Sequence, residues 1–237
     1  GSPLSCIIFA IYVGDLPLWL KAFENTLPLA YADNTFVTVS SETEEALIEG
    51  LQEVGEKVLT FFASNALVAN ADKTGLLIFR PKKSNDARIV ITLGGEKIEE
   101  SAEEKILGVK IQSDLKWDSH FNSVKSQLHY RVGVLRRLKN ILGRRELKSI
   151  AEGLITSKIR YCVSVFCTEY LRLLDTDAVS KYMHELQVLQ NDTMRIITNH
   201  KRSEHIRAED MLRDVSCLSV NRILAYTILI ENWKAVN

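Results

Sequence analysis

The feature that most constrains this fold is a change in the spacing of apolar residues near position 117. Beyond it, apolar residues recur at steps of three and four along one stripe: Phe121, Val124, Leu128, Val132, Leu135, Leu138 and Leu142. That spacing places them on one side of an α-helix. Comparable stripes predict further helices over 144–155, 176–198, 203–215 and 219–233. We therefore predict that residues 118–237 form an all-helical domain.

Before position 117 the chain alternates between helix and strand patterns. The predicted elements are a helix over 2–13, a break at 14–17, a hairpin over 29–40, a helix over 41–65, a strand over 73–79, a Gly94–Gly95 hairpin and a strand over 104–111. Ser41 and Glu44 have the spacing of a capping box at the start of the long helix. The sequence therefore predicts an α+β fold, in which a partial α+β domain over residues 1–117 precedes a helical bundle over 118–237.

The composition is that of a globular chain. Hydrophobic residues make up 46% of the 237 residues, and no uncharged apolar run reaches the roughly 18 residues of a membrane-spanning helix. The four cysteines form no CxxC pair and the five histidines are scattered, so we expect no metal site and free thiols in a reducing, intracellular compartment. The sequence does not decide between nucleus and cytoplasm. Because there is no initiator Met, we expect a fragment, in which Gly1 and Ser2 could derive from a cleaved tag.

A net charge of zero hides an uneven distribution of charge. Residues 1–79 hold 3 Lys/Arg and 10 Asp/Glu, whereas residues 125–160 hold 10 Lys/Arg and 2 Asp/Glu. Such a split is typical of a chain with an acidic part and a part that faces a polyanion. The alternative, in which lysines and arginines only solvate helix surfaces, has similar weight. His200 and His205 flank a further basic stretch and are interpreted as surface residues.

The sequence YADN at residues 31–34 permits two interpretations. Asp and Asn are favoured in turns because they tolerate left-handed backbone angles and bond to their own backbone. The same turn could instead present the carboxylate of Asp33 beside a second ligand at a metal site, as in polymerases. For such a pair on its own, turn chemistry is the commoner explanation.

Five segments stand in an informative order along the chain. GSPLSCIIFAIYVGDLP is similar to a QGSPLSP-type loop and helix, AYADN to a YADD box, and FFASNALVANADKTGLLIF to the pattern WF..N.L.LN..KT....F. ILGVKIQSDLKWDSHF is similar to LGV.(I/L)D..L.W..H, and LQVLQNDTMRIITN to (L/I)..(L/I)Q....R.I.G. In this order they resemble the reverse transcriptase of non-LTR (LINE-type) retrotransposons, from the middle of its palm through its thumb.

The resemblance implies a truncated reverse-transcriptase palm, a small antiparallel sheet with helices, followed by a helical thumb. Nucleotidyl transfer in that family needs two divalent ions, which carboxylates and phosphates hold. Asp33 keeps the first carboxylate of the YADD box, Asn34 replaces the second, and a third would lie on a strand before residue 1. Lys73 stands at the family's KT position, where it could serve as a proton donor. We therefore expect no catalysis, metal or cofactor, with Asp33, Asn34 and Lys73 as remnants; magnesium is expected only for a working polymerase.

Three functions remain open from the sequence. The first, which we rank highest, is an inactive, domesticated domain that binds a partner protein or a second copy through the open palm edge. The second is an RNA- or DNA-binding module whose thumb helices contact phosphates through Lys125, Arg131, Arg136, Arg137, Lys139, Arg144, Arg145 and Lys148. The third is the C-terminal part of an active RNA-directed DNA polymerase. No membrane partner is expected, and the sequence does not reveal the partner's identity, the oligomeric state or the biological process.

Overall fold

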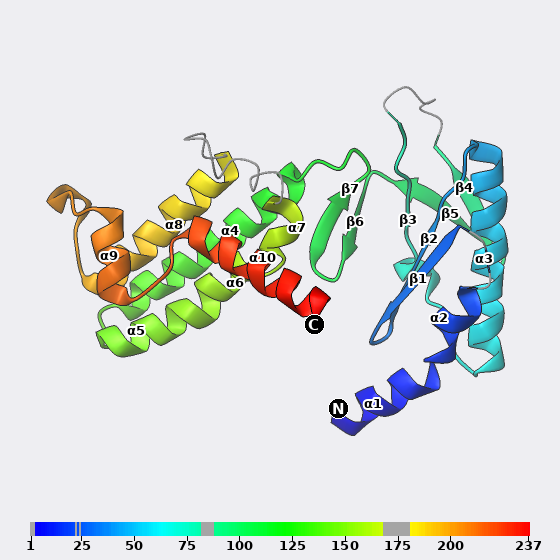
Figure 1. The fold of residues 1–237 in the computed structure, drawn as a ribbon, viewed down its shortest axis with the longest axis horizontal. Helices are drawn as coiled ribbons and strands as arrows, with labels where there is room; N and C mark the ends of the chain where they lie inside the picture. Colours follow the sequence, from blue (N-terminus) through cyan, green and yellow to red (C-terminus); the bar gives the residue numbers. More distant parts are fainter. Residues whose placement is uncertain (1–2, 22, 24, 82–87, 168–180) are drawn as a thin grey trace. The chain divides into compact units, whose positions relative to one another are not determined.

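The computed structural model describes residues 3–21, 23, 25–81, 88–167 and 181–237, and it divides into two compact units, residues 1–104 and 105–237 (Figure 1). The first unit mixes helices with small sheets, and the second is mainly helical. The predicted α+β class is therefore confirmed. The identification of the two parts as palm and thumb, and the boundary at residue 117, stay predictions.

The first unit holds two small sheets beside one long helix. Its elements are α1 (Pro3–Tyr12), α2 (Asp15–Leu20), β1 (Thr26–Tyr31), β2 (Asn34–Val39), α3 (Glu44–Ser64), η1 (Ala71–Lys73), β3 (Leu76–Leu77), β4 (Val90–Leu93) and β5 (Glu96–Ser101). Strands β1 and β2 form an antiparallel hairpin. In the other sheet β5 lies centrally, parallel to β3 and antiparallel to β4.

Helix α3 joins these two sheets because its apolar stripe faces both. Its first half, including Leu47 and Leu51, packs on the buried isoleucines and leucine of the three-stranded sheet. Its second half, around buried Val54, packs with Leu16 and Leu20 of α2 and with side chains of the β1–β2 hairpin. The helix predicted over 41–65 is thereby confirmed: its apolar stripe is packed as expected, and it ends at Ser64, next to the predicted end at Asn65.

Several local predictions in this unit were wrong. The cap of α3 is Thr43, whose Oγ1 accepts a hydrogen bond from the backbone N–H of Ala46 at 3.2 Å, so the Ser41 capping box does not form. The break predicted over 14–17 is shorter and earlier: α1 ends at Tyr12 and residues 13–14 form a turn, but α2 begins at Asp15, and Pro17 sits in its first turn, where a missing N–H costs nothing. The strand predicted over 73–79 is reduced to Leu76–Leu77.

The second unit begins with a hairpin and continues as helices. Strand β6 (Glu103–Ile106) straddles the division between the units, and the unit continues with β7 (Val109–Gln112), α4 (Asp118–Leu138), α5 (Arg144–Ala151), a π-helix η2 (Glu152–Thr156), α6 (Ser157–Arg160), α7 (Val163–Cys167), α8 (Lys181–Thr198), η4 (Arg202–Glu204), α9 (Ala208–Val215) and α10 (Val220–Val236). The single strand predicted over 104–111 was wrong. Leu107 and Gly108 both have positive φ (48° and 86°), which turns the chain and makes two strands.

The stripe of α4 is the centre of the helical core. Phe121, Val124, Leu128, Val132 and Leu135 are all buried, as the spacing predicted. They pack with buried residues of α5 and α8, and α4 runs beside α8 in Figure 1. The predicted helix over 176–198 is confirmed from Lys181 onward, and its earlier part lies outside the described residues.

The segment between β7 and α4 is held by side chains of the predicted LGV…W..H motif. His120 is buried, and its Nδ1 accepts a hydrogen bond from the backbone N–H of Lys110 at 3.2 Å. The ring of His120 packs edge-on against Phe166 of α7, with centroids 4.9 Å apart. These contacts tie the β6–β7 hairpin to α4, so residues 105–117 are part of the second compact unit.

Within the described residues, no helix is long and apolar enough to span a membrane.

We expect Leu128→Ala to lower the free energy of unfolding by about 2–5 kcal/mol, because Leu128 is fully buried and its loss leaves a cavity in the core. Urea unfolding followed by circular dichroism measures this. Leu229→Ala on α10, where the side chain is 69% exposed, is the matched control and should change stability little. Equal effects of the two changes would contradict this description of the core.

We expect Glu100→Gln to destabilise the protein at neutral pH by about 1–3 kcal/mol, because its carboxylate bonds both to the guanidinium of Arg80 and to the backbone N–H of Ile89. The hydrogen bond from Arg80 holds the pKa of Glu100 below its usual 4.5. This stabilisation is therefore present above pH 4.5 and is lost as the pH falls through the lower pKa of the folded protein.

Urea unfolding of wild type and Glu100→Gln at several pH values checks this expectation. The difference between the two should shrink in acid, and exposed Glu99→Gln on the same strand should lack it. A difference that is independent of pH would contradict the assignment.

Candidate functional site

The YADN sequence forms the tip of the β1–β2 hairpin. Tyr31 pairs with Asn34, so Ala32 and Asp33 make the turn, and Asn34 is the first residue of β2. The positive φ (51°) belongs to Ala32, not to Asp33 or Asn34. A left-handed Ala costs about 1–2 kcal/mol, so the backbone does not account for the Asp and Asn at this tip. The conformational argument for ordinary turn chemistry is therefore weak here.

Asp33 and Asn34 are both exposed, and the amide Nδ2 of Asn34 lies 3.4 Å from Oδ1 of Asp33. This pair provides one negative charge. In the part of the chain that the structure describes, no group of three or more His, Cys, Asp or Glu residues could hold a metal ion. Two magnesium ions need several carboxylates or phosphates. The described residues do not complete such a site, and we derive no step through a metal.

Lys73, the third predicted remnant, is exposed at the end of η1. The turn around it is held by Asn70, whose side chain accepts from the N–H of Asp72 at 3.0 Å and whose carbonyl accepts from the hydroxyl of Thr74 at 3.0 Å. Asn70 and Thr74 thus have structural roles. Among the described residues, no hydrogen bond or ion pair joins Lys73 to the Asp33 turn.

Two residues of the LQVLQNDTMRIITN segment also have structural roles. The side chain of buried Gln190 donates to the carbonyl of Leu218 at 2.8 Å, which fixes the start of α10 against α8. Asn199 follows the end of α8 with φ of 61°, at the position where the pattern has Gly. A residue that tolerates left-handed angles is needed there to end the helix. Arg195, in contrast, lies at a surface pocket described below.

The eight predicted phosphate-contacting residues divide into three groups. Three hold carboxylates: Lys125 Nζ lies 2.6 Å from Glu185, Arg144 Nη2 2.7 Å from Asp214, and Lys148 Nζ 3.7 Å from Glu152. The guanidinium of Arg131 donates to the carbonyl of Leu154 in the π-helix η2. Within the described residues no carboxylate pairs with the remaining four, which are Arg136, Arg137, Lys139 and Arg145.

These basic residues do not share one surface. An α-helix turns by about 100° per residue, so Arg131 and Arg136 project from α4 about 140° apart. Arg131 contacts η2 on one flank of the buried stripe. Lys125 and Arg136 lie on the other flank, where Lys125 meets Glu185 of α8 and Arg136 lines a pocket with α8 residues. The predicted residues of α4 therefore do not face one way, and Arg144, Arg145 and Lys148 lie on α5.

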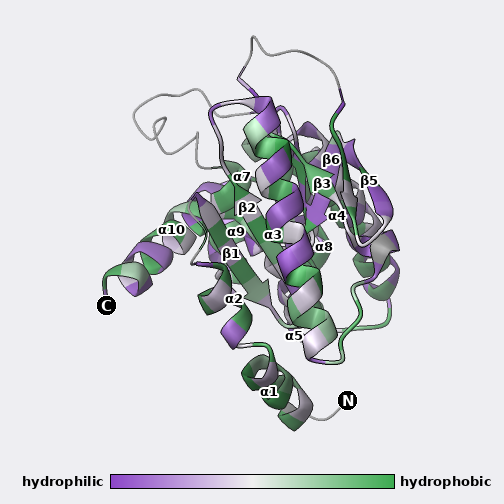
Figure 2. Ribbon diagram, turned by 90° about the vertical axis from the view of Figure 1, so that its right-hand side faces the viewer, coloured by the Kyte–Doolittle hydropathy of each residue, from purple (hydrophilic) through white to green (hydrophobic). Residues whose placement is uncertain are grey.

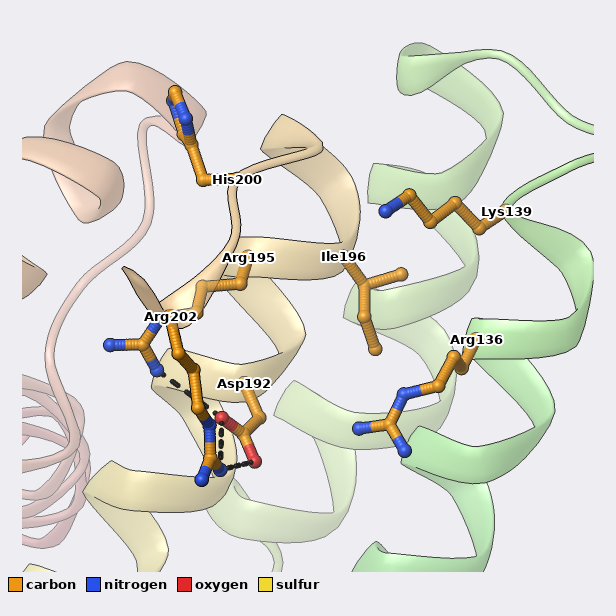
Figure 3. Close-up of a pocket in the computed structure, with 7 residues that line it drawn as sticks. All are labelled: Arg136, Lys139, Asp192, Arg195, Ile196, His200 and Arg202. Carbon is orange, nitrogen blue, oxygen red and sulfur yellow. Dashed lines mark hydrogen bonds and ion pairs between the residues drawn. The ribbon is translucent and has the colours of Figure 1, made fainter. Parts of the chain in front are cut away.

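The pocket lies between the end of α4, the end of α8 and η4, and has a volume of about 190 Å³. Figure 3 shows Arg136 and Lys139 reaching from α4 on one side, with Arg195 and Arg202 around Asp192 on the other. Ile196 and His200 complete its lining. The carboxylate of Asp192 accepts from Arg195 at 3.2 Å and from Arg202 at 2.7 Å. Four cations and one carboxylate line the pocket, so its formal charge is +3 when His200 is counted as neutral.

The sequence prediction missed Arg195 and Arg202 and interpreted His200 only as a surface residue. The hydrogen bond from Nδ1 of His200, 2.6 Å from the Glu204 carboxylate, lowers the pKa of Glu204. Arg195 stands at the Arg of the thumb-helix pattern, and Arg202 ends the basic NHKR stretch that follows α8. Both arginines were therefore visible in sequence patterns, but only the fold shows that they line a pocket with the end of α4.

Exposed apolar side chains gather on α1, which is largely green in Figure 2. Leu4, Ile7, Ile8 and Ile11 are each more than half exposed. On β1, Leu27, Leu29 and Tyr31 are exposed as well. The predicted contact with a partner protein or a second copy stays a prediction.

The comparisons with known proteins give one informative result. No family model matches the chain, and no solved structure matches it significantly. The chain is 24% identical over 224 residues to the probable RNA-directed DNA polymerase from transposon BS of Drosophila melanogaster. The match covers 93% of this chain but only 24% of that protein, so the chain spans about a quarter of the length of its relative.

This similarity corrects one expectation from the sequence. We expected no enzyme, because two of three metal-binding carboxylates are absent from the chain. The relative is named as an RNA-directed DNA polymerase, which favours a family of enzymes, although the match is distant and partial. The similarity supports a reverse-transcriptase-like relationship between this chain and the polymerases of non-LTR retrotransposons.

Proposed function

We propose that this chain is part of an RNA-directed DNA polymerase, and that its helical unit binds the RNA–DNA duplex on which such an enzyme works. The observation that carries this proposal is the similarity to an RNA-directed DNA polymerase over 93% of the chain. Since the match covers 24% of that protein, the activity is proposed for the natural polypeptide that contains this sequence.

Asp33 is the residue of this chain that we place near the reacting phosphates. It lies at the tip of a hairpin whose strands pair without interruption from Thr26–Val39 to Tyr31–Asn34, so the register fixes its position. Its exposed carboxylate is the type of group that binds magnesium, whereas the amide of Asn34 adds only a neutral oxygen. The remaining ligands of a complete site would come from outside the described residues.

The helical unit would bind the duplex through cations that lack carboxylate partners among the described residues. Arg136, Arg137, Lys139 and Arg145 meet that condition and lie on α4, α5 or the turn between them. Contacts of Lys and Arg with phosphates release counterions, so this binding should weaken steeply with salt and depend little on sequence.

We expect Asp33→Ala to slow primer extension on an RNA template by at least about 100-fold, because it removes the carboxylate that we place near the reacting phosphates. Extension of a labelled primer by the natural polypeptide, with magnesium or manganese, measures this. Asn34→Asp should retain the activity, since it adds a second carboxylate to the turn.

The matched control is Asp72→Ala, which removes an exposed carboxylate of η1 from the same unit and should leave the rate unchanged. The proposal is contradicted if the natural polypeptide extends no primer with either ion, or if Asp33→Ala extends as fast as wild type.

A further inference from the structure

A half-buried lysine lies where α6 meets α4. Lys158 is the second residue of α6, which follows the π-helix η2 without a break. The guanidinium of Arg131 on α4 donates to the carbonyl of Leu154, four residues before Lys158. Because residues four apart lie on the same face of a helix, Arg131 and Lys158 meet on one side of this helical segment.

The β6–β7 hairpin brings a third cation to the same place. Nζ of Lys158 lies 5.7 Å from the ring centroid of Tyr161, and the hydroxyl of Tyr161 donates to the carbonyl of Leu107 in the turn of the hairpin. Lys105 stands two residues before Leu107, on β6. Within the part of the chain that the structure describes, no carboxylate forms an ion pair with Lys158, Arg131 or Lys105.

This arrangement disfavours the charged form of Lys158. Partial burial removes water from its ammonium group, and Arg131 and Lys105 repel it, so the pKa of Lys158 is lowered below its usual 10.5. The ring of Tyr161 attracts a cation, but it is opposed by two full charges and by burial. At neutral pH a larger share of Lys158 is therefore free amine than of an exposed lysine, and the free amine is the nucleophile.

The other titratable groups around α6 do not replace this amine as the nucleophile. The thiol of Cys162 follows Lys158 by four residues, but burial raises its pKa, so it stays protonated and unreactive. Glu231 on α10 acts on Cys162 and raises the pKa of that thiol further. Lys158 is thus the reactive group of this cluster.

We propose that Lys158 is a modification site, at which Nζ is acylated by acyl thioesters. The amine attacks the carbonyl carbon of the thioester and the C–S bond breaks. The thiolate leaves and takes up the proton that Nζ loses, so the products are an amide and a free thiol. Acylation turns a repelled cation into a neutral group and removes its repulsion with Arg131 and Lys105. This site is independent of the proposed function.

The test is acetylation of the 237-residue chain by the acetyl thioester of N-acetylcysteamine, with each modified lysine quantified by peptide mass spectrometry. This thioester carries no charge, so attraction of an anionic donor to the three cations cannot produce the result. Lys158 should react at least about threefold faster at neutral pH than exposed Lys57 and Lys234. Its rate should also level off at a lower pH than theirs.

Lys105→Gln removes one repelling charge from an exposed position and should slow the acetylation of Lys158 by about twofold or more. Arg207→Gln removes one charge from an exposed position at the start of α9 and should leave that rate unchanged. The inference is overturned if Lys158 reacts no faster than Lys57 and Lys234, or if the two substitutions have equal effects on its rate.

Discussion

The helical unit depends on the burial of one stripe along α4. Because the helix turns by about 100° per residue, burying Leu128 and its neighbours between α5 and α8 fixes where every other side chain of α4 must point. Charged residues beside the stripe then meet neighbouring helices, as Lys125 meets Glu185 and Arg131 meets the carbonyl of Leu154. The hydrophobic core thus decides which cations are neutralised and which remain available.

The sequence correctly predicted the elements that depend on the spacing of apolar residues or on glycine turns. The stripe of α4, the long amphipathic helix α3 and the Gly94–Gly95 hairpin all stand where their patterns placed them. The predictions were wrong where the conformation of a single residue decides between two local structures. A left-handed Leu107 divides an apparent strand in two, and Thr43 caps α3 in place of Ser41. A leucine, unlike Gly or Asn, gives no sign in the sequence that it will adopt a positive φ.

Only the part of the candidate site that lies within single helices could be predicted from the sequence. Basic residues could be recognised one helix at a time, but ion pairing depends on the neighbours that tertiary packing supplies. Arg144 and Asp214 are 70 residues apart and pair at 2.7 Å, which no local pattern indicates. Arg195 and Arg202 were missed because Arg136 and Lys139, with which they line the pocket, lie far from them in the sequence. The hairpin predicted around Asp33 and Asn34 forms, yet the positive φ falls on Ala32, and the role of these two residues stays a prediction.

Function in this account divides between two places in the chain. The hairpin tip offers a carboxylate at a fixed register position, and the end of α4 and the start of α5 offer cations that lack carboxylate partners among the described residues. The distant similarity to an RNA-directed DNA polymerase gives both places a common context, since such an enzyme has to hold a duplex and act on its end. We expected an inactive protein because the chain lacks two of three carboxylates. The similarity to a polymerase favours a family of enzymes instead.

The most direct measurement is photo-crosslinking of an RNA–DNA hybrid that carries 4-thiouridine, with the crosslinked residues located by mass spectrometry. The account predicts that crosslinks concentrate on the end of α4 and on the start of α5, and that they disappear at high salt. Crosslinks confined to other parts of the chain, or none at low salt, would contradict it.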